Sequence, residues 1–215
     1  MRFPILSAAF AALCFALPTT AQDIQVFGGN SMRACSSVVL FGDGVMAGIT
    51  VTHGQPEWKA EYDSMLDKLK GKTNRLGRDL WTTFMTSVPL EIGGAKLAAG
   101  SYVVGLHCDD KGQFALAFLD ATKAMKDGTM PFGPQKWTPD AVCPMTLNKD
   151  VAKEAVAKML IEVKADEKAP TTGTVSIAWG KHTLTAPMTI HVHGGKTEGG
   201  HGKTEEHGKK PAGHQ

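Results

Sequence analysis

The chain has 215 residues, a formal net charge of +2 and 20% charged residues. Because the charges are nearly balanced and spread along the chain, no basic face for nucleic acid or an anionic membrane is expected. No apolar run reaches the ~20 residues of a membrane-spanning helix, and the length suits one domain with additional terminal segments.

The first residues have the pattern of a secretory signal peptide. Arg2 precedes an apolar run over residues 3–17, and the small residues before Gln22 suit cleavage there. The run is too short to span a bilayer. We therefore expect Met1–Ala21 to be removed and the mature protein to be exported to the periplasm or the extracellular space.

Two apolar, β-branched runs predict the first hairpin, and they are Ser36–Phe41 and Val45–Thr52. The turn at Gly42–Gly44 between them is typical of a hairpin, because glycine adopts the positive φ angles that tight turns require. The weaker run Ile24–Phe27 suits an edge strand before this hairpin.

An amphipathic helix is expected over Glu57–Lys70. Pro56 suits the first turn of a helix, and Gly71 suits its C-terminal cap. Apolar side chains recur between them at helical spacing, and these are Trp58, Tyr62, Met65, Leu66 and Leu69. We expect this stripe to cover one open side or end of a β-sandwich rather than to bind a cofactor.

The middle of the chain predicts further strands. Lys72–Asp79 is expected to be a basic polar loop, and Leu80–Ser87 a strand because it alternates and is rich in threonine and aromatic residues. Val88–Asp120 predicts an antiparallel meander. Turn sequences separate its short apolar runs, and they are Gly93-Gly94, Ala99-Gly100 and Asp109–Gly112.

A long irregular segment, Ala121–Asn148, is expected next because it is rich in proline and glycine. Asn148 suits the N-cap of a short helix over Lys149–Ala157. Pro187 favours a sheet edge for the last strand, because proline lacks the N–H that a ladder needs. The closing strands are expected at Met159–Val163, Thr174–Trp179 and His182–His193.

These elements predict a mainly β fold. We expect an antiparallel β-sandwich over residues 22–193, with one amphipathic covering helix and a second short helix. Residues 194–215 are rich in histidine, glycine and lysine, and this composition favours a disordered tail.

Three cysteines follow the predicted signal peptide: Cys35, Cys108 and Cys143. In an oxidising compartment two of them can pair. Cys108 ends a predicted strand and Cys143 lies in the long segment after it, so a Cys108–Cys143 disulfide is preferred. None belongs to a C-x-x-C motif, which argues against a redox or structural zinc site.

Four segments carry a family resemblance, and they are Thr50–Pro56 (TVTHGQP), Asn74–Thr83 (NRLGRDLWTT), Ile92–Tyr102 (IGGAKLAAGSY) and Val175–Trp179 followed by Ala186-Pro187. Their order resembles the bacterial DUF2911 family of exported domains. The resemblance covers roughly Gly48–Ile190 and implies a β-sandwich. It implies no activity, because the family's own role is unassigned. Gln55 stands where the family has arginine, and Glu57–Lys70 is an insertion.

Three polar residues are candidates for a ligand site at one end of the sandwich: His53, Arg75 and Arg78. The guanidinium fork binds carboxylates at two points, so these side chains suit a concave site for an anionic small molecule. A solvated loop explains the same residues more simply. The chain has no nucleophile elbow, phosphate loop, zincin or nucleotide motif, and we predict no catalytic residue.

Five of the eight histidines lie near the end of the chain, and they are His191, His193, His201, His207 and His214. Neutral imidazole binds zinc, copper and nickel, and a glycine-rich chain can wrap an ion. Weak, exchangeable transition-metal binding by the tail is therefore one hypothesis. A disordered, solubilising end explains the same composition, and we favour that explanation.

The sequence supports three functional hypotheses in descending order. The first is an exported, non-catalytic binding or envelope-associated module whose partner is a small molecule or an envelope protein. The second is a metal-handling protein that acts through the tail with zinc, copper or nickel. The third is an enzyme that uses the polar cluster at the strand ends. The sequence indicates neither the natural ligand nor the oligomeric state.

Overall fold

The structure is a computed structural model that describes residues 32–42, 44–129, 138–149 and 154–192. Several predictions concern other residues: the signal peptide, the strand at Ile24–Phe27, part of the helix at Lys149–Ala157 and the tail from His193 onward. Within the described ranges, none of the helices has the length and apolar character needed to cross a bilayer.

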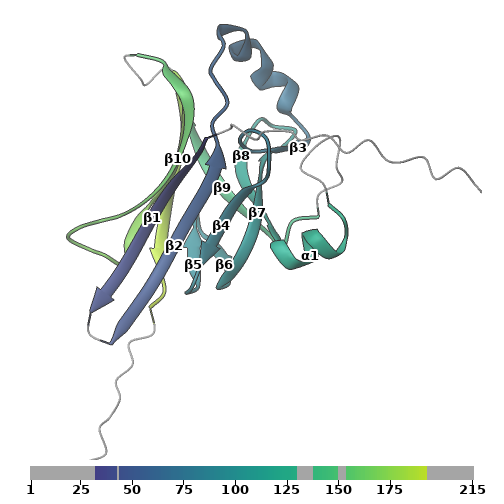
Figure 1. Cartoon of the computed structure of the whole chain (residues 1–215). Helices are drawn as coiled ribbons and strands as arrows, with labels where there is room; N and C mark the ends of the chain where they lie inside the picture. The colour runs from purple at the N-terminus through teal and green to yellow at the C-terminus, as the bar shows by residue number, and fades with distance from the viewer. Residues whose placement is uncertain (1–31, 43, 130–137, 150–153, 193–215) are drawn as a thin grey trace, which may run out of the picture.

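The described residues form a mainly antiparallel β structure (Figure 1), which confirms the predicted fold class. Hydrogen bonds join nine strands in the order β1-β2-β4-β7-β8-β9-β12-β11-β10. Their bounds are β1 (Arg33–Gly42), β2 (Val45–Gly54), β4 (Thr82–Thr86), β7 (Gly100–Cys108), β8 (Phe114–Asp120), β9 (Ala141–Asn148), β10 (Val156–Ala165), β11 (Thr172–Gly180) and β12 (His182–Ile190). The short strands off this path are β3 (Lys72–Arg75), β5 (Leu90–Ile92) and β6 (Ala95–Leu97). The helices are η1, a 3₁₀ helix (Ala60–Leu69), and α1 (Ala121–Lys126).

The sheet curls until its two end strands, β1 and β10, lie side by side, so the sandwich is a nearly closed barrel (Figure 1). Alternate residues of each strand point inward and form the core. At its centre Phe118 is fully buried, and the rings of Phe84 and Tyr102 meet it edge-on with centroids 5.3 and 5.8 Å away. Burying each such side chain contributes about 1.5–3 kcal/mol.

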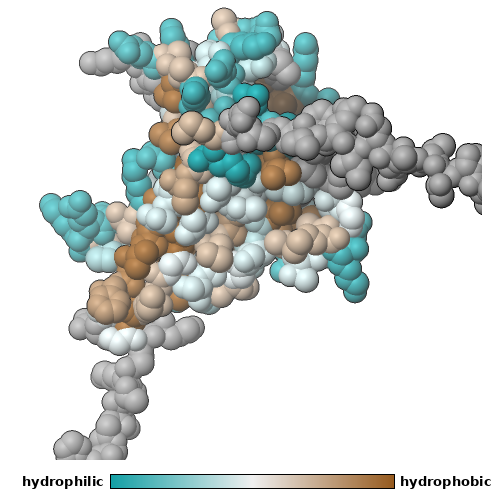
Figure 2. Space-filling view, in the orientation of Figure 1, coloured by the Kyte–Doolittle hydropathy of each residue, from teal (hydrophilic) through white to brown (hydrophobic). Residues whose placement is uncertain are grey.

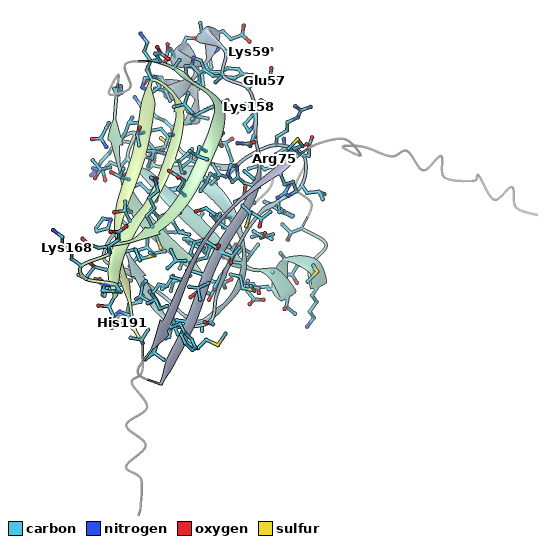
Figure 3. All side chains as sticks on the ribbon, turned by 60° about the vertical axis from the view of Figure 1, so that its left-hand side comes forward. Glu57, Lys59, Arg75, Lys158, Lys168 and His191 are labelled. Atoms are coloured by element: carbon cyan, nitrogen blue, oxygen red, sulfur yellow. The ribbon has the colours of Figure 1, made fainter. Side chains whose placement is uncertain are left out.

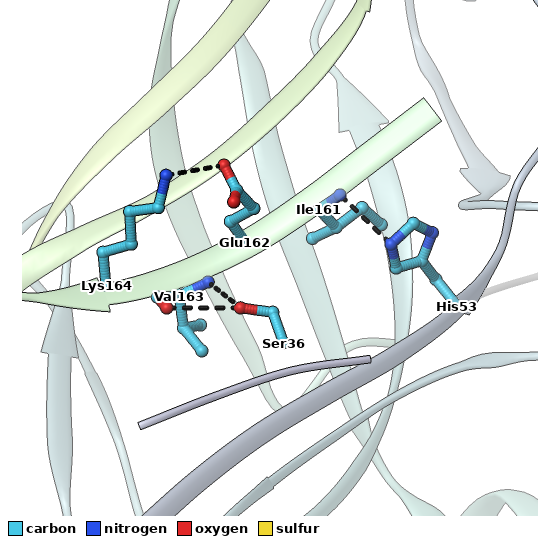
Figure 4. Close-up of polar contacts among 6 residues, drawn as sticks. All are labelled: Ser36, His53, Ile161, Glu162, Val163 and Lys164. Atoms are coloured by element: carbon cyan, nitrogen blue, oxygen red, sulfur yellow. Dashed lines mark hydrogen bonds and ion pairs between the residues drawn. The ribbon is translucent and has the colours of Figure 1, made fainter. Parts of the chain in front are cut away.

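Between the β1–β2 hairpin and β10, the described residues form no backbone hydrogen-bond ladder. We call this gap the seam, and side-chain hydrogen bonds bridge it (Figure 4). Ser36 Oγ donates to the carbonyl of Val163 at 3.3 Å and accepts the N–H of Val163 at 3.1 Å. Further along the seam, His53 Nε2 accepts the N–H of Ile161 at 3.1 Å. Leaving a buried N–H without a partner costs about 1–3 kcal/mol, so these bonds stabilise the nearly closed barrel.

Two segments that the sequence predicts as irregular contain regular structure. Part of Lys72–Asp79 is β3, which pairs with β7. The segment Ala121–Asn148 begins with α1, where the Asp120 carboxylate accepts the N–H of Lys123 at 2.9 Å. It ends with β9, which lies between β8 and β12. The strand β9 contains Pro144. Because proline is typical of turns and irregular segments, the sequence does not predict a strand there.

The sequence predicts that Pro187 lies at a sheet edge, but this is wrong, because β12 has partner strands on both sides. On one side β12 pairs with β11, and on the other with β9 through Thr183–Thr185 and with β5 through Met188–Ile190. Pro187 falls between these last two partners, so its missing N–H removes no ladder bond on that side. The sequence also predicts a helix over Lys149–Ala157. The end of this range that the structure describes is not helical, because Val156 begins the strand β10.

The predicted β1–β2 hairpin is present and extends beyond the barrel on the side away from η1 (Figure 1). Figure 2 shows a hydrophobic surface at its end. Val39, Phe41 and Met46 are 67%, 85% and 78% exposed. Phe41 pairs with Met46, so these side chains share one face of the hairpin.

Candidate functional site

The end of the barrel that carries η1 holds the candidate site. Figure 3 marks this end with the labels of Glu57, Lys158 and Arg75. The amphipathic segment predicted to cover an open end of the fold does so, although it forms a 3₁₀ helix. Gly71, at a φ of 69°, follows the helix and turns the chain into β3.

Hydrogen bonds from β11 and β12 hold the η1 segment against the barrel. The indole N–H of Trp179 donates to the carbonyl of Pro56 at 3.0 Å. His182 Nε2 donates to the Asp63 carboxylate at 2.6 Å. Because a carboxylate only accepts hydrogen bonds, this contact places the proton on Nε2 of His182. These bonds hold Pro56, at the start of the η1 segment, and Asp63, near its middle, against one side of the barrel.

An aromatic cluster lies where the η1 segment meets β11. The rings of Tyr62 and Trp179 meet Trp58 edge-on, with centroids 5.9 and 5.1 Å from its own, an arrangement that aromatic pairs favour. Gly180 has a φ of 62°, and a Cβ there would lie 2.4 Å from atoms of the Trp58 ring. The packing of Trp58 therefore depends on glycine at position 180.

Beneath η1 lies a cavity of about 330 Å³ with a mostly apolar wall. Its apolar residues come from η1 and from several strands of the barrel, and they include Leu66, Leu69, Leu106, Phe114, Ile177 and Leu184. The volume is at the lower end of the range of roughly 300–1,000 Å³ that small-molecule sites occupy. The cavity can thus hold a small apolar molecule.

Three polar residues also line this cavity: Asn74, Arg75 and His182. Arg75 Nη1 donates to the carbonyl of Asp79 at 2.7 Å. Asn74 Nδ2 and His182 Nδ1 are buried and have no hydrogen-bond partner in the described part of the protein. An unpaired buried polar atom costs about 1–3 kcal/mol.

The structure does not bring the three predicted ligand residues together. Arg75 lines the cavity, whereas Arg78 lies on the surface with its Nε 3.5 Å from Asp79 Oδ1. His53 is fully buried at the seam, with Nδ1 3.1 Å from the carbonyl oxygen of Gly54 and Nε2 on the N–H of Ile161.

The burial of His53 follows from the length of β2. The sequence predicts that this strand ends at Thr52, but it continues to Gly54. The alternation that turns Ile49 and Val51 inward therefore also turns His53 inward. In the seam His53 stabilises the fold and does not face a ligand cavity.

Other polar residues at the strand ends have structural partners. Asp109 Oδ1 accepts the N–H groups of Lys111 and Gln113 at 2.9 and 2.7 Å, which stabilises the turn between β7 and β8. His107 Nδ1 is 2.9 Å from Oγ1 of Thr73, its partner residue across the β3–β7 pair. These contacts stabilise local structure.

The metal hypothesis concerns the other end of the molecule. His191 lies away from Arg75 (Figure 3), and its backbone N–H donates to the carbonyl of Pro89 at 3.0 Å. The four histidines from His193 onward are outside the described residues. Among the residues that are described, no group of three or more His, Cys, Asp or Glu side chains is placed to hold a metal ion. Metal binding by the tail stays a prediction.

The predicted disulfide is wrong, because Cys108 and Cys143 are both free thiols. The strand β8 separates them: Cys108 pairs with its Phe114 and Cys143 with its Leu116. Two strand spacings amount to roughly 9.5 Å, whereas a disulfide requires Cα atoms within about 7 Å.

We expect iodoacetamide to label Cys35 in the folded protein and to leave Cys143 unlabelled. Cys35 is exposed, while Cys143 is fully buried and burial raises the pKa of its thiol to about 12. The reactive thiolate is therefore scarce at Cys143. Peptide mass mapping before and after unfolding in guanidinium measures both sites. Rapid labelling of Cys143 before unfolding would contradict its place in the core.

Comparisons of the chain with protein-family models, curated proteins and solved structures found no match. The resemblance to DUF2911 stays a prediction.

Sequence reasoning identifies part of this site and misses the rest. The predicted apolar stripe includes Trp58, Tyr62, Leu66 and Leu69, which all line the cavity. Asn74 and His182 have no local signal, since the sequence places the first in a polar loop and the second at the start of a strand.

Proposed function

We propose that this chain is an exported, non-catalytic binding protein that holds one small, largely apolar molecule between η1 and the barrel. The observation that carries the proposal is the cavity of about 330 Å³ with its mostly apolar wall. Export rests on the sequence pattern of Met1–Ala21. This proposal gives the first of the three functional hypotheses a location and a class of ligand.

The wall of the cavity favours an apolar ligand. Moving apolar surface out of water yields about 25 cal/mol per Å², and Leu106, Phe114 and Ile177 present such surface from three strands. The covering segment adds Trp58 and Tyr62, and aromatic rings supply large apolar contact areas. A molecule enclosed on all these sides loses much of its contact with water.

The side chains around the cavity favour binding over catalysis. Among the described residues that line it, none is a serine, threonine, cysteine, aspartate or glutamate. Those residue types supply most nucleophiles and carboxylate acids or bases in enzymes. The lining histidine, His182, already donates from Nε2 to Asp63 of η1. A role in holding the covering segment explains this contact directly.

Fluorescence titration with N-phenyl-1-naphthylamine, a neutral apolar dye, tests the proposal. We expect saturable binding with one site per chain, and at least tenfold weaker binding in Leu106→Trp. Leu106 is half-buried and lines the cavity, so a larger side chain there occupies ligand space. Val39→Trp is the matched control, because Val39 is 67% exposed on the β1–β2 hairpin.

Leu147→Phe provides a second cavity-filling variant with a smaller change in volume, and Leu147 is also half-buried in the wall. Thermal unfolding of all variants shows whether each one folds. Dye binding that is equally strong in wild type, Leu106→Trp and Leu147→Phe would place the dye elsewhere and overturn the proposal. Absence of binding by folded wild type would overturn it as well.

A further inference from the structure

The outer side of the β1–β2 hairpin and of β4 carries four exposed apolar side chains, which Figure 2 shows in part as the brown surface at the end of the hairpin. Val39, Phe41, Met46 and Met85 are 67%, 85%, 78% and 55% exposed. Phe41 pairs with Met46, and Thr50 of the same strand pairs with Met85, so these side chains share one side of the sheet. We call the outward-facing residues within 35–41, 46–52 and 83–85 the hairpin face.

On the neighbouring strands, α1 covers the same outer side of the sheet. Thr83 of β4 pairs with Val103 of β7, which pairs with Leu119 of β8. Val103 and Leu119 are each only 5% exposed, because Ala124 of α1 packs on them. The described part of the chain therefore covers the outer side of β7 and β8 and supplies no cover for the hairpin face.

The hairpin face has the apolar area that a protein–protein interface needs. Its four large apolar side chains together expose on the order of 500 Å². A standard interface buries about 800 Å² on each partner, and somewhat more than half of this area is apolar. One hairpin face therefore supplies the apolar area of one side of a standard interface.

The hairpin face carries no charged side chain among the described residues. The charged residue of β1, Arg33, lies at the other end of the strand, where its Nη2 donates to the carbonyls of Thr52 and Trp81. A charged face repels a copy of itself, whereas a neutral face does not. Homodimer interfaces are also more apolar than other interfaces, and surfaces that bind lipid are rich in Lys and Arg. The composition of the face therefore favours a second copy of this chain.

The end of the chain does not provide an apolar cover either. His191 lies toward the same end of the barrel as the hairpin (Figure 3). The sequence from 194 to 215 contains no valine, leucine, isoleucine, methionine or aromatic residue. It therefore has no large apolar side chain to place against Phe41 or Met46.

We propose that two copies of this chain pack their hairpin faces against each other about a two-fold axis and form a homodimer. In such a contact the same patch serves both partners, so Phe41, Met46 and Met85 of each chain lose their exposure to water. The hairpin extends beyond the barrel on the side away from η1 (Figure 1), so dimerisation leaves the cavity of each copy accessible. The dimer is independent of the proposed function.

Sedimentation equilibrium of the purified protein tests this proposal. We expect wild type to approach twice the mass of one chain as its concentration rises through the micromolar range. Phe41→Lys and Met46→Lys place like charges against each other in the dimer, so each should raise the dimer dissociation constant at least tenfold. Met125→Lys is the matched control, because Met125 is 75% exposed on α1, outside the hairpin face. It should dimerise as wild type does.

Thermal unfolding shows whether the lysine variants fold, and both should still bind N-phenyl-1-naphthylamine as wild type does, since neither residue lines the cavity. A wild type that keeps the mass of one chain at all concentrations would overturn the dimer. Dimers that Phe41→Lys and Met46→Lys leave unchanged would place the interface elsewhere and overturn it as well. A monomeric wild type that binds phosphatidylcholine vesicles would assign the hairpin face to a lipid surface instead.

Discussion

Replacing Gly180 with alanine is expected to displace Trp58 and to weaken binding of N-phenyl-1-naphthylamine at least tenfold. The new Cβ would lie 2.4 Å from atoms of the Trp58 ring, well inside contact distance, and Trp58 lines the cavity. The ring must move, and the edge-on contacts with Tyr62 and His182 are then lost. A red shift of tryptophan fluorescence and the dye titration measure the two effects.

Gly128→Ala is the matched control for the effect of backbone conformation. Gly128 has a φ of 63°, almost the same as the 62° of Gly180, but no atom lies within 4 Å of a Cβ built there. Both variants carry the penalty of about 1–2 kcal/mol for a side chain in the left-handed region. Dye binding should be normal in Gly128→Ala. If the two variants bind the dye equally well, Trp58 does not shape the cavity.

Replacing His53 is expected to have the second large effect, on stability and on its dependence on pH. His53→Leu leaves the buried N–H of Ile161 without its acceptor, which should lower the free energy of unfolding by about 1–3 kcal/mol at pH 8. His53→Gln should lose less, because the glutamine Oε1 can accept from Ile161 and the residue does not titrate. Chemical denaturation at fixed pH measures these differences.

The pH dependence follows from the environment of His53. Burial lowers the pKa of His53 below its usual value, and the positive charge of Arg33 acts in the same direction. The unfolded chain therefore binds a proton at a higher pH than the folded protein does. Wild type should lose stability as the pH falls below about 6.5, by at most about 1.4 kcal/mol per pH unit, until the folded-state pKa is reached.

The comparison between wild type and His53→Gln isolates this effect, since the other titrating groups are common to both proteins. The stability advantage of wild type at pH 8 should shrink between pH 7 and pH 5. An advantage that stays constant over this range would show that His53 does not titrate with folding. Below the pKa of folded His53, both ring nitrogens carry protons and Nε2 no longer accepts from Ile161.

The amino-acid sequence by itself determined the local elements of this protein. Glycine pairs such as Gly93-Gly94, both at positive φ, mark hairpin turns for a reason that lies in the residue itself. Strand alternation predicts β4 within Leu80–Ser87, and the apolar stripe of Glu57–Lys70 predicts a covering segment. Periods of two and of about 3.6 residues are local properties, so one stretch of sequence is enough to read them.

Only the tertiary structure decided how these elements combine into a site. The pairing of His53 with Ile161 and of His182 with Asp63 joins residues that lie 108 and 119 positions apart, and no local pattern contains both members of such a pair. Likewise, Asn74 and His182 both line the cavity because β3 and β12 belong to the same curled sheet. The cavity is a space between distant segments, and its shape follows from how the nearly closed barrel packs against η1.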